Sequence, residues 1–180
     1  MRTTLPGSAT VLHDSPVGRL RLRVASSGVL RVSFAAREAA AEPPTRGAPD
    51  RAALDLLTAT RRELDAYFAG RLRGFTVPLD LRLATPFTRR VLRTVAAVPY
   101  GATTSYGRLV DRLGRPRTTH QLRAVGAAVG ANPVNLLVPC HRVVGADGRL
   151  VGYAGGLPAK RRLLVLEGGQ QALPGLALTA

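Results

Sequence analysis

Three short helices in succession, between residues 84 and 130, constrain this chain more than any other feature of its sequence. Each has its own start signal, a hydroxyl side chain that can cap free backbone N–H groups, and in the first case a proline follows. The starts are Thr85-Pro86, Thr104 or Ser105, and Thr118 or Thr119, and the stops are Pro99-Tyr100-Gly101, Gly114 and about Gly130. The Gly/Pro turn between the second and third helices predicts a helix-turn-helix.

The third of these helices has two different faces. Its expected core side carries Leu122, Val125 and Val129. Another side, at helical spacing, carries Arg123, Gly126, Ala127 and Gly130. Small residues headed by one arginine would let the helix lie close to a nucleic-acid backbone with Arg123 projecting from it. Tight packing against a neighbouring helix is the other interpretation of the same pattern.

The first part of the chain has strand periodicity instead. Residues 11–34 alternate apolar and polar side chains, as in Leu20, Leu22 and Val24, and predict a hairpin or meander. Residues 36–50 are typical of a surface loop. A helix follows, its apolar side marked by Leu54, Leu57, Leu64 and Phe68, and residues 75–83 alternate again as a strand. We therefore expect an α+β domain over 1–83, without chemistry of its own, and a mostly helical domain over 84–180.

The charge of the chain indicates a polyanionic partner. The formal net charge is +15, and Lys160 is the only lysine among the basic residues. A GC-rich coding sequence would explain arginine in place of lysine. It does not explain why acidic residues fail to balance the arginines.

One cysteine and three histidines exclude an internal disulfide and are too few and too scattered for a zinc site. We expect neither a metal nor a cofactor. The first ten residues lack the apolar core of a signal peptide, and no run approaches the length of a membrane span. These features predict a soluble cytoplasmic protein.

The single cysteine, Cys140, is followed directly by His141. An apolar run over 136–138 predicts a strand that carries the pair inward before Pro139 ends it. A thiol there is a nucleophile if a base or dipole lowers its pKa, and otherwise a small apolar filler. Further along, residues 152–156 form a glycine-rich loop, and Glu167 ends the last helix, where the helix dipole disfavours an anion by about 0.3–1 kcal/mol.

These residues resemble one family. The central match is Pro139-Cys140-His141-Arg142-Val143-Val144, with Asn132-Pro133 before it and Gly152-Tyr153-Ala154-Gly155-Gly156 after it. Shorter matches are Val98-Pro99-Tyr100-Gly101, Ser105-Tyr106, Arg123-Ala124-Val125-Gly126, the last helix with Glu167, Ser15-Pro16-Val17-Gly18 and the segment 64–79. Together they resemble the O6-alkylguanine-DNA alkyltransferases, also called methylated-DNA–protein-cysteine methyltransferases.

The resemblance implies a fold and an activity. The N-terminal domain would be RNase H-like, and the C-terminal domain would carry a winged helix-turn-helix-like element. The protein would act as a monomer on double-stranded DNA containing alkylated guanine, without a cofactor. It would flip out O6-methylguanine and move the alkyl group irreversibly to Cys140, in one turnover per molecule.

The resemblance also implies roles for individual residues. Cys140 would be activated by His141 through a water, with Glu167 orienting the histidine, Asn132 holding the turn, and Tyr106 rotating the phosphate and donating to the base. The DNA-binding residues would be Arg123, as the finger that fills the vacated stack, with Tyr106, Ala124, Gly126 and Ala127. The substrate pocket would be lined by Val129, Val143, Tyr153, Ala154 and Gly155, with the carbonyls of Cys140 and Val143 accepting the exocyclic amine of guanine.

Some features depart from the family pattern, and two other functions remain as alternatives. The turn from Arg115 to Gln121 is longer than in the family, and Val129 stands where a polar asparagine is usual. A cysteine hydrolase would normally take its histidine from a distant segment, which the adjacent His141 argues against. A regulator with a structural Cys140 fits the charge and the helices, but not a Cys-His pair placed behind a glycine-rich loop and Glu167.

Overall fold

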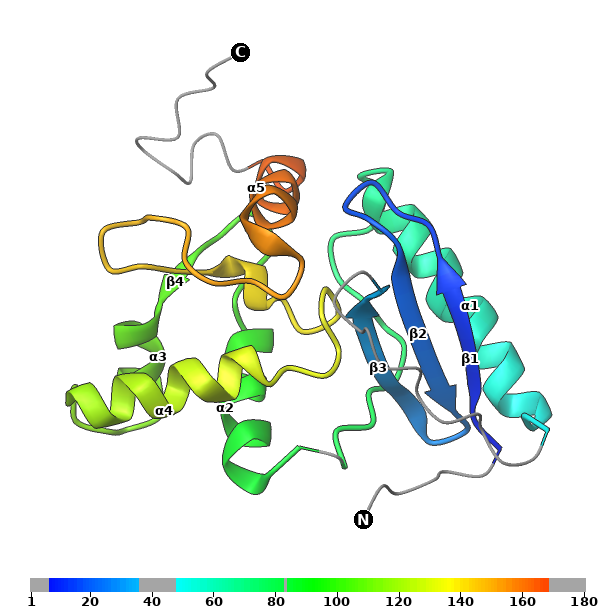
Figure 1. Cartoon of the computed structure of the whole chain (residues 1–180), viewed down its shortest axis with the longest axis horizontal. Coiled ribbons are helices and arrows are strands. Elements are labelled where there is room, and N and C mark those ends of the chain that lie inside the picture. Colours follow the sequence, from blue (N-terminus) through cyan, green and yellow to red (C-terminus); the bar gives the residue numbers. More distant parts are fainter. Residues whose placement is uncertain (1–6, 36–47, 83, 169–180) are drawn as a thin grey trace. The chain divides into compact units, whose positions relative to one another are not determined.

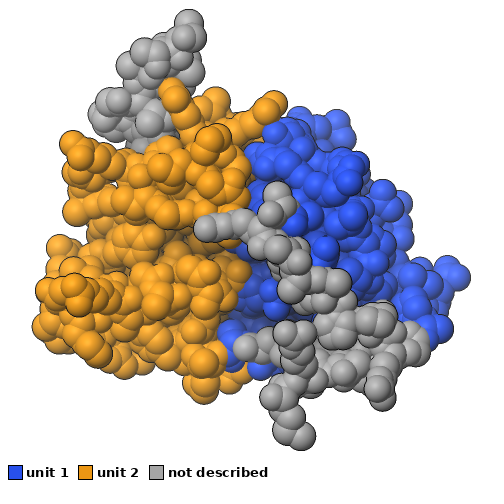
Figure 2. Space-filling model, viewed as in Figure 1, with its two compact units in different colours: residues 1–84, 133–137 blue, residues 85–132, 138–180 orange. Residues whose placement is uncertain are grey.

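The computed structural model of the chain describes residues 7–35, 48–82 and 84–168. It separates into two compact units, coloured in Figure 2. The first comprises residues 1–84 together with 133–137, and the second comprises 85–132 together with 138–180. The strands of the first unit and the helices of the second confirm the α+β class.

The first unit is built on a three-stranded antiparallel meander (Figure 1). Its strands are β1 (Ala9–His13), β2 (Leu20–Ala25) and β3 (Gly28–Phe34), in that order across the sheet. The alternation in β2 has the predicted effect, because Leu20, Leu22 and Val24 are fully buried. Helix α1 (Arg51–Phe68) packs against this sheet and begins at Asp50, whose side chain accepts from the Ala53 N–H.

Two predictions for the first unit are wrong in detail. Residues 75–82 do not form a strand and make only a single bridge, between Leu79 and Val29. The Glu63 carboxylate binds the Thr76 N–H at 2.8 Å, and Pro78 has no N–H to offer. Pairing with β3 is therefore limited to the Pro78 carbonyl, which accepts from the Val29 N–H, and the Asp80 N–H, which donates to the Val29 carbonyl.

The buried side of α1 also differs from the prediction. Leu54 is 42% exposed. The buried positions of the helix are Ala53, Leu57, Thr60, Leu64 and Tyr67. Ala53, Thr60 and Tyr67 are thus core residues that the predicted apolar side did not include, and the predicted Phe68 is only half-buried. Of the predicted surface loop, residues 36–47 fall outside the described residues.

The second unit contains the helix-turn-helix. Its helices are α2 (Pro86–Ala96), α3 (Tyr106–Arg112), α4 (Thr119–Gly130) and α5 (Gly156–Leu166), and a parallel pair of short strands joins β4 (Thr104–Ser105) to β5 (Val143–Val144). The first three helices begin as their start signals predict. The side chains of Thr85, Ser105 and Thr118 each accept a hydrogen bond from a backbone N–H in the first turn.

The predicted strand over 136–138 is not formed. Residues 133–137 belong to the first unit, where Val32 N–H donates to the Pro133 carbonyl and Asn135 N–H donates to the Val32 carbonyl. Leu136 then takes a left-handed conformation, with φ at 73°. A leucine rarely adopts this region, and it turns the chain where the apolar run alone indicated extended backbone.

Candidate active site

The segment after Pro139 is a 3-10 helix, Cys140–Arg142, and it buries three consecutive side chains. The Arg142 N–H donates to the Pro139 carbonyl, which closes the turn. In a strand, Cys140 and His141 would point to opposite faces. The tight turn instead keeps both side chains inside the second unit, which also supplies every other residue of this site.

The thiol of Cys140 lies beside the amide of Asn132. Asn132 Nδ2 is 3.3 Å from Cys140 Sγ and 2.9 Å from the Val138 carbonyl oxygen, to which it donates. Burial raises the pKa of the Cys140 thiol, while the Asn132 hydrogen bond and the charge of Lys160 act in the opposite direction. Asn132 therefore both fixes the chain before the cysteine and favours its thiolate.

Tyr106 is the first residue of α3, and its ring lies next to Gly126 of α4. A Cβ added at Gly126 would be 3.9 Å from the ring, which is ordinary van der Waals contact. Burial raises the pKa of the Tyr106 hydroxyl, and the negative charge of Cys140 raises it further. The hydroxyl is thus a neutral donor at physiological pH, in the electrostatic range of the sulfur.

His141 is held by Glu167. Its Nε2 lies 2.9 Å from Glu167 Oε1, and both side chains are fully buried. Burial lowers the pKa of His141, although the bond to Glu167 raises it. At neutral pH the ring is therefore uncharged and able to accept a proton. Its second nitrogen, Nδ1, has no hydrogen-bond partner among the described residues.

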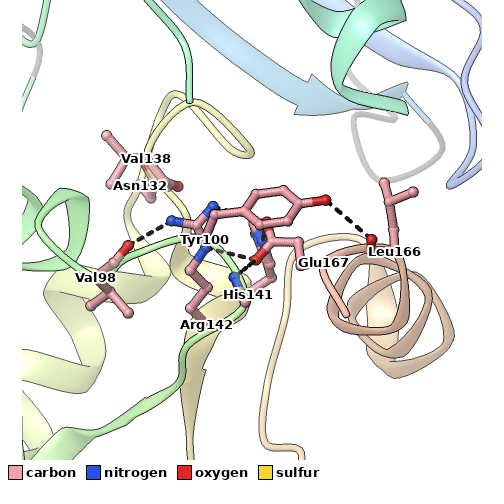
Figure 3. Close-up of polar contacts among 9 residues, drawn as sticks. Val98, Tyr100, Asn132, Val138, His141, Arg142, Leu166 and Glu167 are labelled. Carbon is pink, nitrogen blue, oxygen red and sulfur yellow. Dashed lines mark hydrogen bonds and ion pairs between the residues drawn. The ribbon is translucent and has the colours of Figure 1, made fainter. Parts of the chain in front are cut away.

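Arg142 is a residue of this site that the sequence reasoning missed. It binds Glu167 through two parallel hydrogen bonds of 2.9 Å, and its Nη1 donates to the Val98 carbonyl at 2.6 Å (Figure 3). Such a bidentate pair fixes the carboxylate in position. The negative charge of Glu167, which is unfavourable at the end of α5, is thus stabilised by the buried Arg142 as well as by the hydrogen bond to His141.

The turn after α2 also contacts Glu167. Gly101 has a φ of 76°, and its N–H lies 3.3 Å from Glu167 Oε2. A Cβ at this position would lie 2.8 Å from the Glu167 carbonyl oxygen. Tyr100 adds a hydrogen bond from its hydroxyl to the Leu166 carbonyl at 3.1 Å. The predicted helix stop, residues 99–101, therefore also contacts the end of α5 and helps to hold Glu167 in place.

Replacing Gly101 by alanine is expected to destabilise the protein by more than the strain of a left-handed alanine, which costs about 1–2 kcal/mol. The added clash is with backbone, which cannot move aside cheaply. Gly114→Ala is the matched control, because Gly114 has a φ of 66° and nothing within 4 Å of its added Cβ. Urea unfolding measures both variants. Equal losses in the two would show that the approach of Gly101 to Glu167 is unimportant.

Lys160, on α5, is the second residue that the sequence reasoning missed. Its side chain is fully buried, and Nζ donates to the carbonyls of Val143 and Val151 at 2.6 Å each. Burial lowers the pKa of Lys160 to about 8, with the charge of Cys140 acting against that shift. Both carbonyls predicted to bind the guanine amine accept a hydrogen bond within the protein, that of Val143 from Lys160 and that of Cys140 from the Val143 N–H. The available signal was the uniqueness of this lysine in an arginine-rich chain.

The other predicted residues fall into two groups. Tyr153 is buried with its ring edge-on to His141, at 6.3 Å between centroids, and Val143 and Val129 are buried as well. Ala154 and Gly155 are half-buried in the loop before α5. On α4, Arg123 and Ala127 are exposed, while Ala124 and Gly126 are half-buried. The structure thus brings the sulfur, imidazole, carboxylate, Asn132 and Tyr106 together and leaves Arg123 on the surface.

Over residues 7–35, 48–82 and 84–168, no helix has the length and apolar character needed to cross a membrane. No group of three or more histidine, cysteine, aspartate or glutamate side chains in these ranges is arranged to hold a metal ion.

Comparison with known families and proteins agrees with this geometry. Residues 10–81 match the family model of the 6-O-methylguanine DNA methyltransferase, ribonuclease-like domain, and residues 86–169 match that of its DNA binding domain. The methylated-DNA–protein-cysteine methyltransferase of Mycobacterium tuberculosis is 45% identical over 155 residues, covering 86% of this chain and 88% of that protein. The one from Methanosarcina acetivorans is 38% identical over 157 residues, covering 87% and 96%.

Solved structures give the same result. The crystal structure of Mycobacterium tuberculosis O6-methylguanine methyltransferase has a TM-score of 0.74 and 40% identity, covering 93% of this chain and 96% of that one. The structure of Mycobacterium tuberculosis OGT in complex with DNA has a TM-score of 0.73 and 41% identity, covering 92% and 94%. The chain belongs to the 6-O-methylguanine DNA methyltransferase family, whose two domains it matches in order.

Proposed function

We propose that this protein is a methylated-DNA–protein-cysteine methyltransferase that repairs O6-methylguanine, and other O6-alkylguanines, by taking the alkyl group onto Cys140. The observation that carries the proposal is the buried thiol in one tight turn with a neutral imidazole, which a buried carboxylate orients. The names of its relatives support the same activity.

The chemistry is a displacement at carbon. His141 takes the thiol proton through a bridging water, while Glu167 stabilises the imidazolium that results. The sulfur then bonds to the alkyl carbon, and the bond from that carbon to O6 breaks. The guanine leaves with the electron pair and regains a proton, with the Tyr106 hydroxyl donating to the base. The thioether is stable, so each molecule acts once.

Access to the lesion requires the base to leave the helix. Unstacking costs about a few kcal/mol, which an inserted side chain can offset. Arg123 is exposed on α4, so its guanidinium is available for this role. Behind it the small side of the helix, formed by Ala124, Gly126 and Ala127, allows close approach to the minor groove.

The flipped base would enter the space around Cys140. Tyr153 and Val129 would line its alkyl side, and the loop at Ala154 and Gly155 would offer backbone amides to O6. The net charge of +15 supplies long-range attraction to DNA. DNA is the partner that the DNA binding domain match supports. We propose that the protein acts on double-stranded DNA as a monomer in the cytoplasm.

The stoichiometry of repair tests this function. Increasing amounts of a duplex containing O6-methylguanine are mixed with a fixed amount of protein, and repaired guanine is counted by chromatography. One guanine repaired per protein molecule, and none with Cys140→Ala, is the expected result. Repair that continues past one equivalent would contradict a suicide mechanism. Sequence-selective binding without repair, unchanged in Cys140→Ala, would favour the regulator.

A further inference from the structure

The buried charges of the second unit do not balance. Among its described residues, the buried groups that carry charge at neutral pH are Arg142, Lys160 and Glu167. Two cations against one anion leave one positive charge. The carboxylate of Glu167 is already bound by Arg142 on both oxygens and by His141 on one. Lys160 is therefore the cation without a counter-ion.

The hydrogen bonds of Lys160 also indicate that its positive charge is not compensated. Its described hydrogen bonds are to two carbonyl oxygens, those of Val143 and Val151. Carbonyl dipoles solvate an ammonium only in part, and removing such an ion from water costs several kcal/mol unless an anion compensates. Cys140 lies three residues before Val143, whose carbonyl accepts from Lys160 and whose N–H donates to the Cys140 carbonyl. The negative charge of Cys140 raises the pKa of Lys160.

The choice of side chain is also informative. Every other basic residue in the chain is arginine, and the one lysine occupies this fully buried position. An arginine remains charged in any surroundings and carries a broad planar fork. A lysine is a compact point charge that can gain or lose its proton with its neighbours. A structural brace between two carbonyls does not require that property.

We propose that Lys160 is the counter-ion of the Cys140 thiolate, so that its buried ammonium balances the negative charge that forms on Sγ when the thiol gives up its proton. This role deepens the proposed alkyl transfer and rests on it for its purpose. When the sulfur becomes a neutral thioether, the balance is lost again. Lys160 then becomes an uncompensated cation and releases its proton more readily.

Several other titratable groups lie on the Cys140 turn or on the elements around it. His141 and Arg142 lie on the same turn, Glu167 follows α5, and Tyr106 comes from α3. His141 is neutral, Arg142 and Glu167 cancel, and burial keeps Tyr106 protonated. Among these described groups, Lys160 is the positive charge that no carboxylate matches, and its charge lowers the pKa of His141 and of Cys140.

The first test measures the thiol without DNA or guanine. The rate of reaction with dithiodipyridine is followed against pH, which gives the midpoint of thiolate formation. Lys160→Met is expected to raise this midpoint by about one unit or more, the usual effect of losing an adjacent opposite charge. Lys160→Arg, which keeps the charge, should stay nearer the wild type. Arg162→Met, an exposed position on the same helix, is the matched control and should leave the midpoint unchanged.

The second test needs no variant. Because Lys160 is the only lysine, protein labelled with ¹³C-lysine gives one side-chain signal in an NMR titration. Its midpoint should lie near 8 in the free protein and fall when methyl methanethiosulfonate caps the thiol, because coupling between two sites is reciprocal. An unchanged lysine midpoint after capping, or an unchanged thiol midpoint in Lys160→Met, would overturn the proposal and reduce Lys160 to a brace. Neither result would affect the proposed repair activity.

Discussion

Arg142→Met lowers the free energy of unfolding by about 3–5 kcal/mol, because it leaves the Glu167 carboxylate as a buried charge without its main partner. Both side chains of the pair are buried, and three hydrogen bonds are lost at once. We expect alkyl transfer to fall as well, since Glu167 would no longer be held against His141. Urea unfolding and the rate of reaction with free O6-benzylguanine measure the two effects.

Two further variants test this reason. Arg149→Met breaks an exposed ion pair with Asp147 in the same unit and should cost less than about 1 kcal/mol. The double variant Arg142→Met/Glu167→Gln removes both charges and should recover a large part of the lost stability. The single variants Arg142→Met and Glu167→Gln are measured alongside it. If the loss of stability in the double variant equals the sum of the losses in the two single variants, the cost comes from packing and not from an unpaired charge.

Arg123→Ala slows transfer from duplex DNA by roughly a hundredfold and leaves the reaction with free O6-benzylguanine unchanged. The physical reason is that an extruded base leaves a gap in the stack, and filling it with a guanidinium offsets about a few kcal/mol of unstacking. Each 1.36 kcal/mol is about tenfold in rate. Free O6-benzylguanine has no stack to leave, so the exposed Arg123 has nothing to contribute there.

The control for this variant must lose the same charge elsewhere. Arg62→Ala removes an exposed arginine from α1, in the first unit, and should change the duplex rate only slightly. Comparing the two variants at several salt concentrations separates general attraction to DNA from a specific role. Equal slowing of both substrates by Arg123→Ala would contradict the finger role and would indicate a disturbed site.

The helix-turn-helix was predictable from the sequence because its signals are local. Thr85, Ser105 and Thr118 each cap the helix that follows them, and such caps depend on residues only a few positions apart. The failures come from contacts that are distant in sequence. In the predicted strand over 75–83, the Thr76 N–H donates to the Glu63 carboxylate and not to a neighbouring strand. In the apolar run over 136–138, the left-handed conformation of Leu136 changes the direction of the chain. Alternation reports which side chains are buried, but not which groups the backbone bonds to.

The same limit applies to the candidate site. Cys140 is conspicuous because it is the single cysteine, and His141 because it follows that cysteine directly. Glu167 is conspicuous because an anion is unfavourable at the C-terminal end of a helix. In a basic chain Arg142 resembles an ordinary surface charge, and being the only lysine does not by itself assign Lys160 to the site. Their importance depends on burial, and burial is set by how α5 packs against the Cys140 turn.

The central claim is that the sulfur of Cys140 itself takes the alkyl carbon. The measurement that tests it most directly is peptide mapping by mass spectrometry after reaction with a duplex containing a ¹³C-labelled methyl group on O6 of guanine. The account predicts one labelled methyl on the peptide that contains Cys140, and fragmentation that assigns it to the sulfur. A protein that keeps its fold and a free thiol while the lesion stays in the DNA, or a label found on any other residue, would contradict it.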